Sequence, residues 1–154
     1  MEFSENISKS GTQPIIGTQI NIKYGEEIGI IPVIAKSAKG YKSIIELSSK
    51  SYLDNDNFSL PHCKIDDLLK IGNDIILFSG SIYGLIGKLF NKGKLHEINE
   101  IYKLFKKKFL DDFYIEIQRH GDQYEKSFEK FNLNKSKELN IPIIATNEVF
   151  YLDK

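Results

Sequence analysis

The chain has 154 residues, of which 41% are hydrophobic and 27% are charged, and its 21 basic and 21 acidic side chains balance at pH 7. This length fits one globular domain, and the lack of a basic excess gives no electrostatic case for binding nucleic acid or an anionic membrane. Abundant Ile and aromatic residues exclude a disordered chain, and no run of about 18 apolar residues predicts a membrane span. A single cysteine and the absence of a signal peptide indicate a reducing cytoplasm.

Residue types that hold metals are scarce in this sequence. It has three histidines and one cysteine, and no HxH, CxxC or HExxH spacing occurs. No GxGxxG, GKS or GKT string that would cradle a phosphate is present either. We therefore expect neither a zinc centre nor a P-loop made by this chain alone, and composition predicts only an α/β domain.

Strands and helices are predicted to alternate along the chain. Residues 2–10 have the pattern of a helix that starts earlier, and Gly11 is placed to end it. Ser37 is the predicted N-cap of a helix, and Pro32 favours an edge position or a bulge for its strand. The predicted strands are residues 14–22, 28–36, 74–78, 113–118 and 141–146, the predicted helices are 40–53, 64–71, 83–90, 94–109 and 122–139, and residues 54–63 are a predicted loop. This order is typical of a mostly parallel sheet, open or closed into a barrel.

Two of these helices have apolar residues at helical spacing, which predicts one buried face on each. Four lysines crowd the last turns of helix 94–109, where they complement the helix dipole. We interpret them as a solvated face, with nucleic-acid contact as the alternative. The predicted inward-facing residues are Leu95, Ile98, Ile101, Tyr102, Phe105 and Phe109 in the first helix and Tyr124, Phe128 and Phe131 in the second.

The strand at 74–78 runs into Ser79, Gly80 and Ser81 and then into a helix. Ligands gather at the carboxyl ends of strands in α/β folds, so the two serines are candidates to cradle a phosphate. A turn with a helix cap is the simpler interpretation, and we favour it. His120, after strand 113–118, is a candidate acid or base, or it holds the turn at Gly121.

Three further groups have ordinary structural interpretations. Arg119 is suited to bidentate anion binding, but a salt bridge to Glu116 or Asp122 is the favoured prediction. Glu116 itself is expected to pair with a lysine. The adjacent His62 and Cys63 point apart on an extended chain and make a poor metal pair.

Five strings, in this order, resemble one family. They are PIIGTQINI (14–22), VIAKSAKGYKSIIELSS (33–49), ILFSGSIYGLI (76–86), FYIEIQRHG (113–121) and IPIIATNEVFYL (141–152). Together they resemble the polymerase and histidinol phosphatase (PHP) domain at the amino end of bacterial replicative DNA polymerase III alpha subunits. The last string is the most specific, since it is close to that family's ATND-x-HYL.

The resemblance implies a fold and, in active members, a metal site. The expected fold is a distorted, mostly parallel α/β barrel, incomplete at the amino end, with residues 1–154 forming a single partial PHP domain. Active members hold a metal cluster at the strand ends through His, Asp, Glu and Cys, because several anionic or imidazole ligands are needed to hold divalent cations and polarise a water.

This chain departs from the family at the metal ligands that can be placed. The early HxH string is absent, and the remaining ligand positions correspond to Gln19, Ile30, Ser81, Glu148 and Phe150. Only Glu148 keeps a carboxylate, and one carboxylate cannot offset the desolvation of a divalent cation. We therefore expect a metal-free, catalytically silent cleft with no cofactor of its own.

Two functions follow as hypotheses. In the favoured one, the chain is a piece of the polymerase alpha subunit: a scaffold that supports the rest of that subunit and docks a partner, most plausibly the proofreading exonuclease subunit. The nucleotidyl transfer, its Mg²⁺ and the DNA contacts would then lie outside this chain, and no membrane is involved. In the alternative, the chain is a metal-dependent PHP phosphoesterase that acts on phosphate esters or mismatched 3′ ends. A third possibility is a stand-alone binding module.

Overall fold

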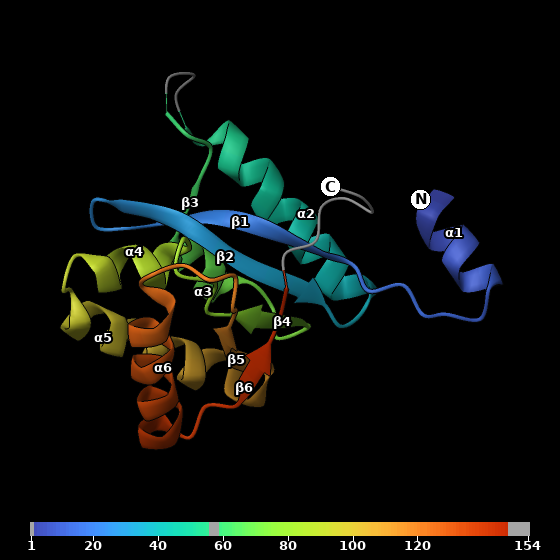
Figure 1. Cartoon of the computed structure of the whole chain (residues 1–154). Helices are drawn as coiled ribbons and strands as arrows, with labels where there is room; N and C mark the ends of the chain where they lie inside the picture. Colours follow the sequence, from blue (N-terminus) through green and yellow to red (C-terminus); the bar gives the residue numbers. More distant parts are fainter. Residues whose placement is uncertain (1, 56–58, 148–154) are drawn as a thin grey trace.

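A computed structural model describes residues 2–55 and 59–147 (Figure 1). Its strands are β1 Gly17–Tyr24, β2 Glu27–Ala35, β3 Cys63–Lys64, β4 Ile75–Phe78, β5 Phe113–Ile117 and β6 Ile143–Ala145. Its helices are α1 Glu2–Lys9, α2 Ala38–Leu53, α3 Ile65–Lys70, α4 Leu85–Asn91, α5 Leu95–Phe109 and α6 Glu125–Leu139, with a short 3₁₀ turn at Leu110–Asp112.

The described strands form one sheet in the order β3-β1-β2-β4-β5-β6. The pairs β1–β3, β4–β5 and β5–β6 are parallel, and β2 is antiparallel to both of its neighbours. Every described strand except β2 therefore runs in the same direction, which confirms the predicted α/β class with a mostly parallel sheet. Within the described residues β3 and β6 are edges, so this sheet is open, and barrel closure stays a prediction.

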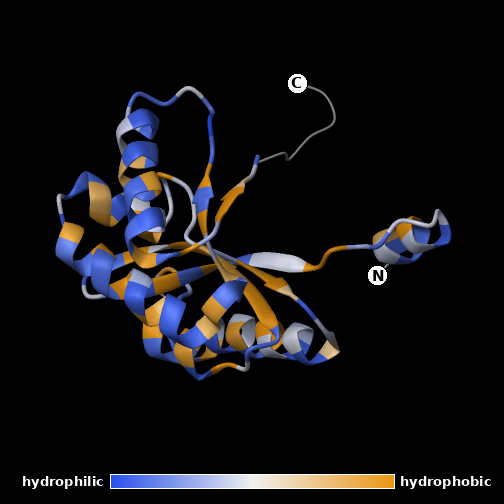
Figure 2. Cartoon of the chain, turned by 90° about the horizontal axis from the view of Figure 1, so that it is seen from below, coloured by the Kyte–Doolittle hydropathy of each residue, from blue (hydrophilic) through white to orange (hydrophobic). Residues whose placement is uncertain are grey.

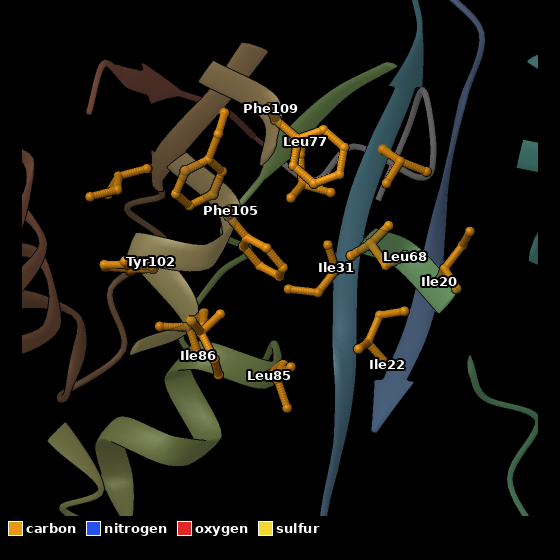
Figure 3. Packing of buried hydrophobic residues seen from close by; sticks show 14 of the residues in the cluster. Ile20, Ile22, Ile31, Leu68, Leu77, Leu85, Ile86, Tyr102, Phe105 and Phe109 are labelled. Carbon is orange, nitrogen blue, oxygen red and sulfur yellow. The ribbon is translucent and has the colours of Figure 1, made fainter. Parts of the chain in front are cut away.

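One face of the sheet carries the hydrophobic core. Burial alternates along β2, where Ile31 and Val33 are buried and the residues between them are only partly covered. Alternation places these two side chains on one face, together with Ile20 and Ile22 of the paired strand β1. Figure 3 shows Ile20, Ile22 and Ile31 directed toward side chains from α3, α4 and α5. Ile44 and Leu47 of α2 and Phe128 of α6 belong to the same cluster, so the helices α2 to α6 cover this face.

The β2 strand and the start of α4 approach each other unusually closely. A Cβ atom on Gly29 would lie 2.4 Å from the Leu85 Cα, so only glycine fits there. The strand after the β1–β2 turn is thereby held against the segment that precedes α4. This contact positions Ile30 beside the loop that contains Ser81.

Local capping follows the sequence. The Ser37 Oγ accepts a hydrogen bond of 3.2 Å from the Gly40 N–H at the start of α2, which confirms the predicted N-cap. At the other end of the chain, Asn140 ends α6 in the left-handed conformation, at φ 50°. Asparagine tolerates this conformation better than most residues.

Several details of the sequence prediction were wrong. Pro32 lies in an interior strand rather than at an edge; it sits one residue before the β4 pairing begins at Val33, where a missing N–H is tolerated. Leu95 is 46% exposed and Tyr124 is 53% exposed, because Leu95 is the first residue of α5 and Tyr124 is the N-cap residue before α6, so both lie outside the stretch that meets the core. The β3 strand was missed where the predicted loop 54–63 meets the predicted helix 64–71, since the strand is only two residues long.

The α1 helix stands apart from the body of the molecule in both views (Figures 1 and 2). None of its residues is buried, and Phe3 is largely exposed. An extended segment leads from α1 into β1. None of the described helices has the length and apolar character that a bilayer crossing requires.

Candidate functional site at the strand ends

Two of the predicted site residues, Gln19 and Ile30, lie on the second face of the sheet, which is turned away from the helices. Gln19 of β1 lies opposite Pro32 of β2. Extending the β2–β4 register by one residue beyond the Val33–Leu77 pair places Pro32 opposite Phe78. Phe78 in turn pairs with Tyr114 of β5 and contacts its ring edge-on. Gln19 therefore lies at the level where β4 ends.

Ile30 lies two residues along β2 from Pro32, so it faces the same way. The loop after β4 comes close to it: a Cβ atom on Gly84 would lie 2.9 Å from the Ile30 carbonyl oxygen. Gly80, with φ +84°, lies against the same carbonyl. The structure thus brings Gln19, Ile30 and the loop containing Ser81 to one region, as the resemblance implies.

The two serines of this loop make different contacts. The Ser81 Oγ accepts a hydrogen bond of 3.3 Å from the Tyr83 N–H, which supports the favoured interpretation of a turn, although the N-cap residue of α4 is Gly84. Ser79 is fully buried, and its Oγ accepts a hydrogen bond of 2.9 Å from the Glu116 N–H. Ser79 therefore joins the ends of β4 and β5 within the protein.

Glu116 is a feature of the site that sequence reasoning assigned wrongly. Among the described residues it pairs with no lysine: its side chain is buried, and its Oε1 accepts hydrogen bonds from Gln118 Nε2, at 2.9 Å, and from the Thr146 hydroxyl. Its Oε2 is buried without a hydrogen-bond partner among the described residues. With Ser79, these contacts connect the ends of β4, β5 and β6, and we call Ser79, Glu116, Gln118 and Thr146 the interstrand latch.

His120 lies in the loop after β5, and its ring Nε2 is 3.2 Å from Gln118 Oε1. Its backbone N–H and those of Gly121 and Asp122 all donate to the buried Glu125 carboxylate, at distances from 2.9 to 3.2 Å. Gly121 takes φ +91°, which favours glycine. The loop is thus held as a turn on Glu125, and the described contacts of the His120 ring include no acid or nucleophile.

Arg119 forms a salt bridge, but its partner is Glu129 of α6 rather than Glu116 or Asp122. The two side chains make a bidentate pair, with Nε–Oε2 at 3.0 Å and Nη2–Oε1 at 2.7 Å. The guanidinium lowers the pKa of Glu129, and the carboxylate raises the pKa of Arg119. Asp122 instead accepts a hydrogen bond from the Tyr83 hydroxyl at 2.5 Å, which lowers the pKa of Asp122.

His62 and Cys63 lie far along the chain from these residues and make separate contacts. The Cys63 thiol is buried and donates to the Leu47 carbonyl at 3.1 Å, while His62 Nδ1 lies 2.7 Å from the Leu60 carbonyl oxygen. Burial raises the pKa of Cys63 to about 11. Because the thiolate is the nucleophilic form, this cysteine is not suited to act as a nucleophile at neutral pH.

A metal cluster does not fit the described part of the site. Gln19, Ile30 and Ser81 offer an amide, an alkyl group and a hydroxyl, whereas divalent cations in such sites need carboxylates, imidazoles or thiolates. Within residues 2–55 and 59–147 no three His, Cys, Asp or Glu side chains are grouped to hold a metal. Glu148 and Phe150, the last two ligand positions, lie outside the described residues.

Comparison with known proteins defines the family. The family model of the PHP domain matches residues 1–120, and the chain belongs to the PHP domain family.

Among the similar curated proteins are three named DNA polymerase III subunit alpha. The chain is 32% identical over 154 residues to the one from Haemophilus influenzae, 35% over 159 residues to the one from Rickettsia felis and 31% over 165 residues to the one from Borreliella burgdorferi. These matches cover 98%, 100% and 100% of this chain, but only 13%, 13% and 14% of the relatives. The chain therefore spans about one seventh of the length of these relatives.

Proposed function

We propose that this chain is a catalytically silent PHP scaffold of a replicative polymerase alpha subunit. The observation that carries the proposal is the replacement of ligands at the strand ends, where Gln19, Ile30 and Ser81 stand together. None of these side chains supplies the charge that offsets the desolvation of a divalent cation. A hydrolytic water activated by metal is therefore not expected here.

The interstrand latch supports a structural role for the same region. The buried carboxylate Glu116 is directed into hydrogen bonds with Gln118 and Thr146, and its backbone N–H is bound by Ser79. A carboxylate used in this way ties neighbouring strands together instead of facing a substrate. A sheet whose neighbouring strands are joined by side-chain hydrogen bonds is suited to a domain that supports a larger polymerase.

The similarity to curated alpha subunits supports the place of this domain in replication. In this proposal the chain forms a single partial PHP domain over residues 1–154 and acts in the cytoplasm. It supports the remainder of the alpha subunit, in which nucleotidyl transfer, Mg²⁺ and DNA binding would reside. It also docks a partner, for which the proofreading exonuclease subunit is the leading candidate.

Metal analysis of the purified chain tests the silent cleft. We expect substoichiometric zinc, manganese and iron by mass spectrometry, and no release of phosphate from a generic phosphate ester. The variant Ser81→Ala should leave both results unchanged, because the hydroxyl holds only the turn at Tyr83. Stoichiometric metal together with phosphatase activity that a chelator abolishes would establish the alternative, a PHP phosphoesterase.

The docking role is tested separately. The purified chain is mixed with a proofreading exonuclease subunit and the complex is sought by analytical ultracentrifugation. We expect a heterodimeric species whose amount rises with concentration. If the two sediment independently at all concentrations, the exonuclease is not the partner.

A further inference from the structure

The outward face of α6 carries a stripe of lysines. Lys126, Lys130 and Lys137 are exposed, and with Leu133 they occupy positions i, i+4, i+7 and i+11 of the helix. This spacing puts all four side chains on one face. The opposite face is buried, where Phe128 packs in the core cluster.

These three lysines have no ion-pair partner among the described residues, in contrast to their neighbours. Arg119 is bound to Glu129, and Lys135 lies 2.7 Å from Glu138. The chain as a whole is neutral, so three uncompensated charges on one helix face make a local positive field. A field of this kind attracts anionic groups.

The stripe borders a groove. The loop after β5 and the outward face of α6 enclose a hollow of about 820 Å³, which includes Lys126, Lys130, Leu133 and Lys137. Three acids also line it, and each already has partners. Glu129 binds Arg119, Glu125 accepts three backbone N–H groups, and Asp122 accepts hydrogen bonds from the Tyr83 hydroxyl and the Tyr124 N–H. Among the described residues that line the groove, the three lysines are therefore the charged side chains that can bind a ligand.

A second hollow of about 650 Å³ continues from the first and shares Arg119, Glu129 and Leu133 with it. Its wall is apolar, with Ile117 from β5 and Ile143 and Ala145 from β6. Ile143 is 40% exposed, and β6 is an edge of the described sheet. The groove thus has a basic end and an apolar end, and the apolar end lies beside the edge strand β6.

We propose that this groove binds an acidic, extended polypeptide segment of a partner protein. Carboxylates of the segment lie along Lys126, Lys130 and Lys137, and an apolar side chain of the same segment enters the hollow against Leu133 and Ile143. This proposal rests on the docking role proposed above. It specifies where on the chain the partner binds and which kind of segment is bound. The metal content of the cleft is independent of it.

A polypeptide fits this groove better than a nucleic acid does. Sites for single strands combine free basic side chains with aromatic rings on which bases stack. Here the sole arginine of the chain is held by Glu129, and among residues 2–55 and 59–147 no aromatic side chain lines either hollow. The apolar side chains around Ile143 offer no hydrogen bond or charge to a phosphate backbone.

Fluorescence anisotropy with the full chain tests the proposal. The probe is a short labelled peptide rich in glutamate with leucines near one end; a peptide with glutamine in place of glutamate and a labelled oligothymidylate serve as comparisons. We expect the glutamate peptide to bind, the other two to bind more weakly, and the affinity to fall as salt is added.

Charge reversal locates the site. The triple variant Lys126→Glu, Lys130→Glu, Lys137→Glu should lose about tenfold or more in affinity. The matched control Lys42→Glu, Lys70→Glu, Lys107→Glu makes the same change in net charge at exposed lysines outside the groove, and it should change affinity by less than about twofold. Circular dichroism checks that the variants are folded. If the triple variant is unfolded, the single variant Leu133→Ser tests the site independently, because it should also lower the affinity for the glutamate peptide.

Three results would overturn the proposal. The first is no binding of the glutamate peptide at low salt. The second is an equal loss in the groove variant and in the control variant, which would indicate attraction by net charge alone. The third is tighter binding of oligothymidylate that the groove variant abolishes, which would make the surface a nucleic-acid site. A metal-free chain that fails this test would still be a silent PHP scaffold.

Discussion

Two buried carboxylates show how differently the same residue type is used in this protein. Glu27, at the start of β2, is 7% exposed and accepts hydrogen bonds of 2.7 and 2.9 Å from Lys92. Glu116 meets no cation among the described residues and is bound by Gln118 and Thr146 instead. The first joins the β1–β2 turn to the loop before α5, and the second joins strand ends.

Glu27 should make stability depend on pH. The hydrogen bond from Lys92, with a further one from Lys94, lowers the pKa of Glu27 below its ordinary value of 4.5. The contribution of Glu27 to the free energy of unfolding is therefore present above pH 4.5. It is lost as the pH falls through the lowered pKa of Glu27 in the folded state. Because Lys92 is more than half exposed, we expect the variant Glu27→Gln to lose only about 1 kcal/mol at neutral pH.

Urea denaturation at several pH values measures this effect. The difference between the two proteins should be constant from pH 7 down to near pH 5 and should shrink below the ordinary pKa of 4.5. The control Glu26→Gln, at an exposed neighbour, should not differ from the parent at any pH. A Glu27→Gln difference that stays the same down to the lowest pH would show that the ion pair does not contribute.

The latch gives a second prediction at the residue scale. The change Thr146→Val removes the hydroxyl that donates to Glu116 and leaves a buried carboxylate with one side-chain donor fewer. We expect unfolding to become easier by about 1–3 kcal/mol. The matched control is Thr18→Val at an exposed position of β1, where the change should stay within about 0.5 kcal/mol. Equal stabilities for the two variants would mean that the latch is not stabilising.

At the scale of elements, each of the helices α2 to α6 has one face directed to a single core, and local contacts set the helix ends. The α2 helix begins where Ser37 accepts from Gly40. In α6, buried Asn132 accepts a hydrogen bond of 2.9 Å from the Tyr102 hydroxyl of α5, while the lysine stripe faces out. Burial raises the pKa of Tyr102, which favours the protonated hydroxyl that donates in this bond between α5 and α6.

The cap of α2 can be tested directly. The variant Ser37→Ala should lose about 1 kcal/mol of stability, since the Gly40 N–H then lacks its side-chain acceptor. The variant Ser49→Ala, at an exposed interior position of the same helix, should be neutral or slightly stabilising because alanine favours helix. Thermal melts of both variants compare the two directly. If Ser49→Ala is the more damaging change, the cap is not the feature that starts the helix.

For the whole molecule, the described sheet has one covered face, an edge at β6 and a helix that stands alone. Large apolar side chains are exposed near these features, among them Ile15, Ile16 and Ile143. Edge strands with exposed apolar residues associate with other chains unless they are protected. The isolated chain is therefore expected to be marginally stable or to self-associate.

Sedimentation velocity over a range of concentrations checks this expectation. We expect the weight-average mass to rise with concentration and the rise to be reduced in Ile143→Lys, which places a charge on the β6 edge. The control Ile45→Lys introduces the same charge on the exposed side of α2, where Ile45 is 45% exposed. A stable monomer at every concentration, with a cooperative melt at high temperature, would contradict the prediction.

Most of the elements were predictable because their signals are local. The alternation of FYIEIQ, the apolar period of residues 94–109 and the cap at Ser37 each depend on residues close in sequence, and the structure has β5, α5 and α2 at these places. The site was predictable only in outline. The resemblance named Gln19, Ile30 and Ser81, but nothing in the spacing of these residues brings them together.

The sequence by itself determined the α/β class, the family and the residue types that replace metal ligands, because these depend on the order and identity of residues alone. Tertiary structure decided which partners the charged and polar groups take. Arg119 forms its salt bridge with Glu129, Glu116 accepts a hydrogen bond from Thr146, and three lysines of α6 line a groove. Those choices depend on distances between segments far apart in the chain, and the packing of the helices on one face of the sheet sets these distances.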